Sequence, residues 1–280
     1  MVEPVPTPKR FWADLSTVEF EALDPGRTIA VLPVAATEQH GPHLPVGVDT
    51  RLIDGLVAAT VPRLPPDASV LFLPTLAVGK SNEHDAFAGT LALTAHTLID
   101  VWMELGASVA RAGLRKLVLF NSHGGQTAVM DIVSHDLRAQ HDLLVFSVTW
   151  FRLGLPPGMI GDDERRFGIH GGEVETSMML ALAPHLVDMS KARSFESLLR
   201  RHADDYPILG DGVAAKMGWQ TQDLNPTGAV GNAAAATAQK GQAIIDFAAG
   251  RFAQLLQELE RLPFSTLVAR SPQARRDPIG

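Results

Sequence analysis

The chain has 280 residues, of which 46% are apolar and 20% charged, and it contains no cysteine. This size and composition are typical of a globular protein with a sizeable core, and the missing cysteines exclude disulfides, thiolate metal ligands and a cysteine nucleophile. The formal net charge of −7 argues against nucleic acid as a partner, because non-specific binding to nucleic acid needs a basic surface.

Strands and helices alternate along the first half of the chain. In chain order the pattern predicts a helix at 11–23, a strand at 28–34, a helix at 51–64, a strand at 70–73, a polar loop at 78–90, a helix at 94–112, a strand at 117–120, a helix at 127–140 and a strand at 143–149. Thr94 is the expected N-cap of the third helix. Because the crossovers are long and the strands continuously apolar, the pattern indicates a parallel sheet covered on both faces.

The second half of the chain is less regular. Its expected elements are a proline- and charge-rich loop at 155–166, an apolar helix at 178–182, long irregular stretches at 183–232 and a long helix at 233–262. The segment 219–232 resembles a lid or an oligomer contact more than a core element, because long loops are usually functional or form interfaces. No repeat or linker divides the chain, so we expect one domain, 1–280, with 264–280 as a tail.

Polar side chains gather just past the ends of two predicted strands. The segment after the first strand carries two carboxylates and two imidazoles: Glu38, His40, His43 and Asp49. His123 follows a later strand in the same way, and ligand sites of parallel sheets lie outside the carboxyl ends of the strands. Carboxylates and imidazoles suit zinc, manganese or iron(II), and an aspartate can bridge two ions. The pattern favours a metal site; the alternative is a proline-bent polar loop with ordinary hydrogen bonds.

Glycines follow His123 directly. Gly124 and Gly125 let the backbone turn sharply and approach a ligand closely, and the next helix can offer backbone amides to an anion. A plain strand-to-helix turn is the alternative.

A second polar segment begins at His170. This histidine, with Glu173 and Glu175, could supply a general acid or base and a further metal carboxylate, or the acids could simply favour a helix N-terminus. Because the two glutamates are two positions apart, they point different ways on a helix, and only one can reach a given ion.

Other common catalytic motifs are absent from the sequence. It has no Gly-x-Ser-x-Gly elbow for a serine nucleophile, no Walker A motif and no Gly-x-Gly-x-x-Gly dinucleotide fingerprint.

Four segments together resemble the creatininase (creatinine amidohydrolase) family. They are Glu38-Gln39-His40-Gly41-Pro42-His43-Leu44-Pro45 through Asp49, Glu83-His84 through Leu91, Asn121-Ser122-His123-Gly124-Gly125-Gln126, and His170-Gly171-Gly172-Glu173-Val174-Glu175-Thr176-Ser177. They occur in order between about Trp12 and Ala183, and their combination is specific. The resemblance implies a three-layer α/β/α fold, a two-metal amidohydrolase site and a homohexamer built as a trimer of dimers.

Carried over by position, the resemblance implies a set of metal ligands. Glu38, Asp49 and His123 would hold one ion, and His40 with the bridging Asp49 would hold the other. Creatininase has the second ion's carboxylate two residues after the third motif's histidine, where this chain has Gly125. Glu175 is the expected replacement, with Glu173 as the fallback. Zinc is the expected metal, with manganese or iron as alternatives.

The same resemblance implies catalytic and substrate-binding residues. His170 matches a histidine that binds substrate or shuttles a proton, and with Glu175 it is the expected catalytic pair. The expected substrate-binding residues are Ser81, Glu83, His84, Gly124 and Gly125.

Departures from the family pattern bear on the substrate. Creatininase has an aromatic residue and an acid in place of Gly124 and Gly125, and a Trp-Asp pair in place of Arg166-Phe167. Ala88 replaces a proline. The first two changes argue against creatinine itself, whereas Ala88 is a minor change in its loop. The two glycines fit other branches better, which act on the mycofactocin precursor peptide, formamidopyrimidine nucleotides or a keto-inositol derivative.

The predicted function is a binuclear metal-dependent amidohydrolase that cleaves a C–N amide bond by a metal-bridged hydroxide. A cyclic amide or a formamide is the expected substrate class. The alternatives are a peptidase acting on a modified peptide C-terminus, a hydrolase of a keto-inositol derivative, an isomerase or lyase of a keto-sugar, and a non-catalytic metal- or ligand-binding protein.

The expected partners and location follow from the same reasoning. The expected partner is a small-molecule amide. No apolar run is long enough to span a bilayer, and the first ten residues lack the apolar segment of a secretory signal. We therefore expect no membrane association and a cytoplasmic location.

Overall fold

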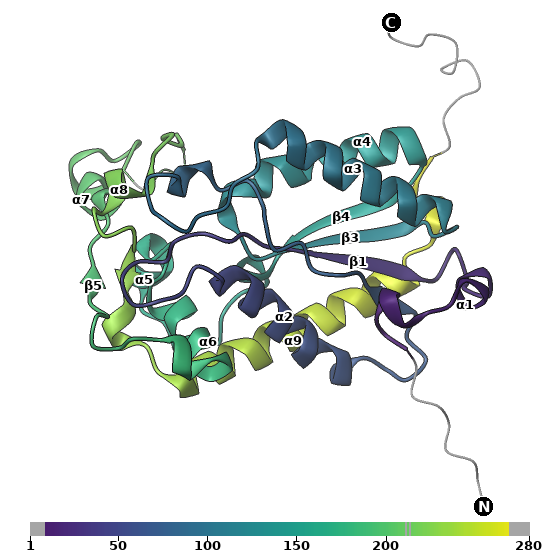
Figure 1. Cartoon of the computed structure of the whole chain (residues 1–280), viewed down its shortest axis with the longest axis horizontal. Coiled ribbons are helices and arrows are strands. Elements are labelled where there is room, and N and C mark those ends of the chain that lie inside the picture. Colours follow the sequence, from purple (N-terminus) through teal and green to yellow (C-terminus); the bar gives the residue numbers. More distant parts are fainter. Residues whose placement is uncertain (1–8, 211, 213, 269–280) are drawn as a thin grey trace, which may run out of the picture.

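A computed structural model describes residues 9–210, 212 and 214–268 (Figure 1). Its centre is a four-stranded sheet in the order β2 (Val70–Phe72), β1 (Ile29–Val34), β3 (Lys116–Asn121), β4 (Leu144–Thr149). All three pairings are parallel, and the register places the last residues of β1, β3 and β4 side by side. The predicted parallel sheet is therefore confirmed, and three strands end together at one edge.

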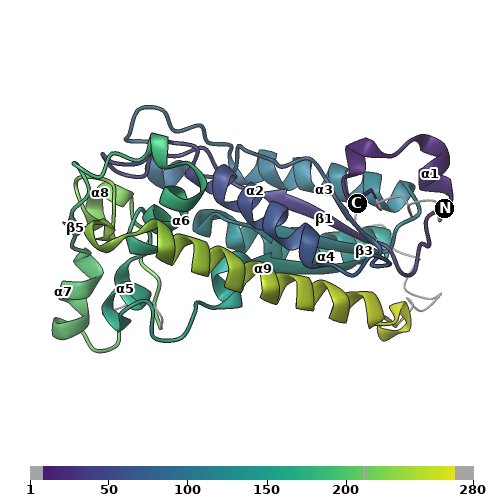
Figure 2. The same cartoon turned by 90° about the horizontal axis from the view of Figure 1, so that it is seen from below.

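Helices cover both faces of this sheet. One layer holds α3 (Ala95–Arg111) and α4 (Thr127–His141); the other holds α2 (Val48–Thr60), α6 (Glu173–Leu182) and α9 (Ala238–Arg261) (Figures 1 and 2). Side chains alternate between the faces of a strand. Ile29 and Val31 accordingly join the core under α2 and α9, whereas Ala30 and Leu32 join the core under α3. This confirms the three-layer α/β/α prediction.

Most predicted elements are present, with shifted ends. Thr94 caps α3 by accepting a hydrogen bond from the Thr97 amide, as predicted. The helix predicted at 11–23 is instead a single turn, Trp12–Asp14, followed by α1 (Thr17–Glu21). Ser16 and Glu19 form a capping box, in which each side chain accepts a hydrogen bond from the other's backbone amide, so a new helix begins there.

The prediction of a loop at 155–166 is wrong from residue 162 onwards, where the chain forms α5 (Asp162–Phe167). Acidic residues in the first turn of α5 and basic residues in its last turn suit the helix dipole. The long C-terminal helix begins at Ala238 rather than 233, after a short turn at Ala233–Ala235.

The remaining elements lie past the carboxyl edge of the sheet (Figure 1). They are a two-stranded antiparallel pair, β5 (Ser194–Phe195) with β6 (Gly231–Asn232), and two helices, α7 (Leu198–Asp205) and α8 (Thr221–Leu224). Within the segment 219–232, Leu224, Ala229 and Val230 are buried, so part of this segment packs against the rest of the chain, and its role as a lid or oligomer contact stays a prediction. Val230 also pairs with the backbone of His170.

The prediction for the C-terminal end of the chain is covered only in part. The predicted tail at 264–280 includes a short turn, Phe264–Thr266, and lies outside the described residues from 269 onwards. Of the helices that the structure describes, none combines the length and apolar character needed to cross a membrane.

Candidate metal centre and active site

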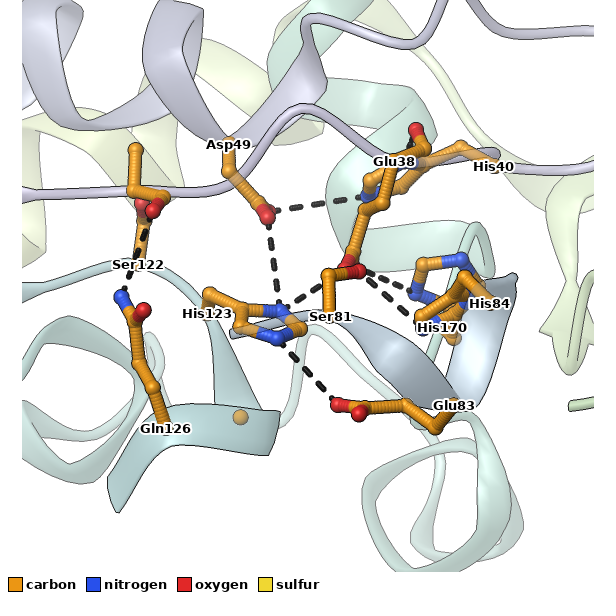
Figure 3. Close-up of polar contacts among 12 residues, drawn as sticks. Glu38, His40, Asp49, Ser81, Glu83, His84, Ser122, His123, Gln126 and His170 are labelled. Atoms are coloured by element: carbon orange, nitrogen blue, oxygen red, sulfur yellow. Dashed lines mark hydrogen bonds and ion pairs between the residues drawn. The ribbon is translucent and has the colours of Figure 1, made fainter. Parts of the chain in front are cut away.

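Polar side chains, all of them buried except the half-buried Glu175, converge past the carboxyl edge of the sheet (Figure 3). They come from the segment after β1, the first turn of α2, the short turn at Asn82–His84, the second residue after β3, and the loop before α6 with the first turn of α6: Glu38, His40, Asp49, Glu83, His84, His123, His170 and Glu175. Segments far apart in sequence thus meet at one place.

One group consists of Glu38, Asp49 and His123. His123 Nδ1 lies 3.1 Å from Glu38 Oε1 and 3.5 Å from Asp49 Oδ2. The three side chains are buried, and their ligand atoms lie within 4.8 Å of one another. Two oxygens and one nitrogen in this arrangement can hold a divalent ion.

A second group consists of His40, Asp49 and Glu175. His40 Nε2 lies 3.6 Å from Asp49 Oδ1 and 3.8 Å from Glu175 Oε2. His40 Nδ1 lies 3.0 Å from the Glu38 carbonyl oxygen and donates to it, which leaves Nε2 as the ligand atom. Asp49 therefore presents one oxygen to His40 and the other to His123, as a bridging carboxylate would.

The donor set fits metal ions. His40 Nε2 and Asp49 Oδ2 are both buried without a hydrogen-bond partner. Unpartnered buried polar atoms are rare because they are costly. Two divalent ions would satisfy both atoms and offset the repulsion among Glu38, Asp49 and Glu175.

The two glutamates of α6 have different environments. The Glu175 carboxylate accepts a hydrogen bond from the Gly171 amide at 2.6 Å and faces His40. Glu173 instead pairs with Lys240 of α9. Only Glu175 reaches the cluster, although its role as a ligand stays a prediction.

His170 and His84 lie on the side of Glu38 that faces away from Asp49 (Figure 3). His170 Nδ1 and His84 Nε2 are each 3.6 Å from Glu38 Oε1. The His170 ring lies between its neighbours, with centroids 4.1 Å from His40 and 4.3 Å from His84. Glu38, His40 and His170 also form a third group that could hold an ion, which the sequence did not predict.

Glu83 lies behind His123, on the side away from Glu38 (Figure 3). Its Oε1 is 3.2 Å from His123 Nε2, and its Oε2 accepts from Lys80 Nζ at 3.0 Å. A Cβ atom added at Gly125 would lie 1.5 Å from Glu83 Oε1. The Glu83 carboxylate thus occupies the space beside Gly125.

Ser81 and Gly124 complete the predicted residues. The buried Ser81 hydroxyl donates to Glu38 Oε2. Gly124 is exposed and starts the short turn Gly124–Gln126 before α4, with open space where a side chain would stand.

Charge and burial shift the pKa of several groups in the absence of metal. Burial lowers the pKa of His40, but the carboxylates of Asp49 and Glu175 outweigh it and raise that pKa to about 9. Burial raises the pKa of Glu175 to about 7. Burial lowers the pKa of His84 to about 4, so this ring is neutral near pH 7.

The family model for creatinine amidohydrolase matches residues 13–256, which is most of the chain.

The chain belongs to the creatininase family.

Relatives of this chain belong to several branches of the creatininase family. The mycofactocin precursor peptide peptidase of Mycobacterium ulcerans is 31% identical over 221 residues, covering 76% of this chain and 78% of that protein. The creatinine amidohydrolase of Pseudomonas putida is 28% identical over 269 residues, covering 89% and 96%. A 3-dehydro-scyllo-inosose hydrolase of Thermotoga maritima is 25% identical, covering 85% and 80%. The prediction that this chain is an enzyme of a hydrolase family is confirmed.

Solved creatininase structures share the fold. A creatininase with Mn and a Zn–Zn form of a creatininase mutant each give a TM-score of 0.71 at 24% identity, covering 91% of this chain and 100% of theirs. The fold predicted from the creatininase resemblance is therefore confirmed.

Sequence reasoning missed some residues of this creatininase-family site. Gln39 lies between two predicted ligands, and its amide contacts His84. Its position inside the first motif was a usable signal. Thr221 also contacts His84, across 137 residues of sequence, and no local pattern indicates this.

Proposed function

We propose that this protein is an amidohydrolase with two divalent metal ions per subunit that cleaves a C–N bond in a small cyclic amide, a formamide or a similar substrate. The observation that carries the proposal is the placement of Asp49 between His40 and His123, with one oxygen 3.6 Å from the first and the other 3.5 Å from the second. Family membership supports it independently.

The proposed ligands are Glu38, Asp49 and His123 for one ion and His40, Asp49 and Glu175 for the other. When bound, such ions polarise a carbonyl oxygen and lower the pKa of water so that it attacks at neutral pH. Zinc is proposed, with manganese or iron as alternatives, and the metal-bridged hydroxide stays a prediction.

Other side chains of the chain would handle protons and orientation. His170 Nδ1 faces the cluster and could carry a proton from the attacking water to the leaving nitrogen. Ser81 donates to Glu38 and holds that carboxylate in place. The backbone of Gly124 and Gly125, at the start of the turn before α4, would orient the substrate.

The proposal is tested by metal content and turnover together. We expect about two ions per chain by elemental analysis of protein supplied with zinc, and loss of both when Asp49→Ala removes the shared carboxylate. Asp54→Ala, on the exposed face of the same helix, is the matched control and should keep both ions. An Asp49→Ala protein that retains two ions would overturn the bridging role.

A second candidate is a peptidase that acts on a modified peptide C-terminus. The supporting observation is the 31% identity with a mycofactocin precursor peptide peptidase, against 28% with a creatinine amidohydrolase. Incubation with lactams, formamides, keto-inositol derivatives and short C-terminally modified peptides separates the candidates. Binding of metal with no turnover of any of them would favour a non-catalytic protein.

Assembly and location are also proposals. A trimer of dimers is expected from the creatininase resemblance, and light scattering after size exclusion would measure it. The cytoplasmic location would be checked by cell fractionation.

A further inference from the structure

Gln39 is held in one orientation by two backbone groups. Its Oε1 accepts from the Gly41 amide at 2.8 Å, and its Nε2 donates to the Gly228 carbonyl oxygen at 2.8 Å. A backbone N–H can only donate and a carbonyl can only accept. A flipped amide would face both groups with the wrong atom, so the two contacts fix which atom is oxygen and which is nitrogen.

This orientation sets the tautomer of His84. The second N–H of Gln39 points at His84 Nδ1, 2.7 Å away, which must therefore accept. The proton of the neutral ring is then on Nε2, the atom that faces Glu38 Oε1. Thr221 Oγ1 lies 2.9 Å from both His84 Nδ1 and the Glu83 carbonyl oxygen, and it has one proton for these two neighbours. The Gln39 N–H decides between them, because it lies closer to Nδ1 and can only donate, so a proton on Nδ1 would face it directly.

The main chain of Gln39 sets the same tautomer in His170, but this ring turns its other nitrogen toward Glu38. His170 Nε2 lies 2.6 Å from the Gln39 carbonyl oxygen, which accepts only, so Nε2 carries the proton. The lone pair is then on Nδ1, which also faces Glu38 Oε1. The Gln39 side-chain nitrogen also lies 3.3 Å from His170 Nε2, but an amide N–H cannot accept, so the proton on Nε2 is directed to the nearer carbonyl oxygen.

We propose that Gln39 is a positioning residue that makes His84 a hydrogen-bond donor and His170 a proton acceptor at the same point of the site. The two rings have centroids 4.3 Å apart, so their N–H and lone pair converge beside Glu38. In amide hydrolysis the carbonyl oxygen accepts a hydrogen bond, which His84 Nε2 can donate. The attacking water loses a proton, which His170 Nδ1 can take and then pass to the leaving nitrogen. The substrate part of this inference rests on the proposed amidohydrolase function; the tautomers do not.

The direct test is the ¹⁵N spectrum of histidine-labelled, zinc-loaded protein, in which the two ring nitrogens of each tautomer are distinguished. We expect protonated Nε2 in both His84 and His170. In Gln39→Glu no side-chain N–H remains, so His84 should lose its preference and move its proton towards Nδ1. His170 should not change, because its partner is a main-chain carbonyl that every substitution retains.

Gln126→Glu is a matched control, because it also replaces a buried glutamine with a carboxylate. The Gln126 amide donates to Asn121 and to the Ala35 carbonyl oxygen rather than to a histidine. Neither histidine tautomer should change in it. If Gln39→Glu does not fold, Gln39→Met removes the same donor, and the wild-type spectrum alone still decides the assignment. A wild-type His84 protonated on Nδ1 would overturn the proposal, as would a Gln39→Glu spectrum identical to the wild type.

Kinetics provide the functional readout once a substrate is found. With metal content unchanged, Gln39→Glu should lower kcat by roughly ten- to a hundredfold with little change in KM, as expected for a residue that orients a catalytic group. An unchanged kcat beside the predicted tautomer shift would overturn the positioning role. If the zinc-loaded wild type cleaves no amide at all, the amidohydrolase proposal is refuted, whereas the tautomer assignment is still decided by the ¹⁵N spectrum.

Discussion

At the scale of single residues, the space beside His123 depends on Gly125. A methyl group there would lie 1.5 Å from Glu83 Oε1 and 2.5 Å from His123 Nε2, so one of these side chains would have to move. Gly125→Ala should therefore lower zinc content and melting temperature. Gly124→Ala is the neighbouring control, since nothing lies within 4 Å of its added methyl group. Equal metal content and melting temperature in both variants would show that Glu83 does not fill this space.

The choice between two carboxylates is a second prediction at this scale. Glu175→Gln should lose the ion held with His40, because an amide is a weaker ligand than a carboxylate. Glu173→Gln should keep both ions, because its carboxylate pairs with Lys240 instead. Elemental analysis of the two variants decides the question, and the reverse pattern would assign the ligand to Glu173.

The sequence identified most of these residues for a physical reason. Strand ends of a parallel sheet meet at one edge, so Glu38, His40 and His123 had to lie near one another. The roles of Gln39 and Glu83 were not accessible in the same way. Gln39 reaches the Gly228 carbonyl 189 residues further along, and Glu83 fills a gap that exists only because residue 125 has no side chain.

At the scale of elements, two helices begin earlier than the sequence pattern predicts, because their first turns contain polar residues. The sequence placed helix starts at 51 and 178, whereas α2 begins at Val48 and α6 at Glu173. Apolar periodicity detects only the turns that face the core. The overlooked first turns hold Asp49 in one helix and Glu175 in the other, so these turns contribute to the candidate site.

The contact between α6 and α9 yields a prediction at this scale. A methyl group at Gly241 would lie 1.8 Å from the Ser177 carbonyl oxygen, so the two helices could not keep their separation. Gly241→Ala should destabilise the fold by about 1–3 kcal/mol, the usual cost of overpacking. Gly250→Ala, in the same helix with open space around it, should instead stabilise by roughly 0.5–1 kcal/mol. Denaturant titration measures both, and a destabilised Gly250→Ala would contradict the helix-propensity argument.

At the scale of the whole molecule, the candidate site joins segments that the sheet alone leaves separate. Glu38 follows β1, His123 follows β3, Asp49 begins α2, and Glu175 lies in the first turn of α6. Ions held between them would act as cross-links specific to the folded state, so their binding free energy adds to stability. Three carboxylates also repel one another when the ions are removed.

The size of that stabilisation should depend on pH. In metal-free protein the pKa of His40 is raised from 6.5 to about 9: burial lowers it, but the carboxylates of Asp49 and Glu175 outweigh the burial. A histidine with a raised pKa stabilises the metal-free fold fully below pH 6.5, and this contribution is lost as pH rises towards 9. An ion must displace the same proton, so metal binding strengthens over the same range. The melting-temperature difference between zinc-loaded and chelator-treated protein should therefore widen from pH 6.5 to 9, and scanning fluorimetry across that range measures it. A difference that stays constant or narrows would show that His40 does not exchange a proton for a metal ion.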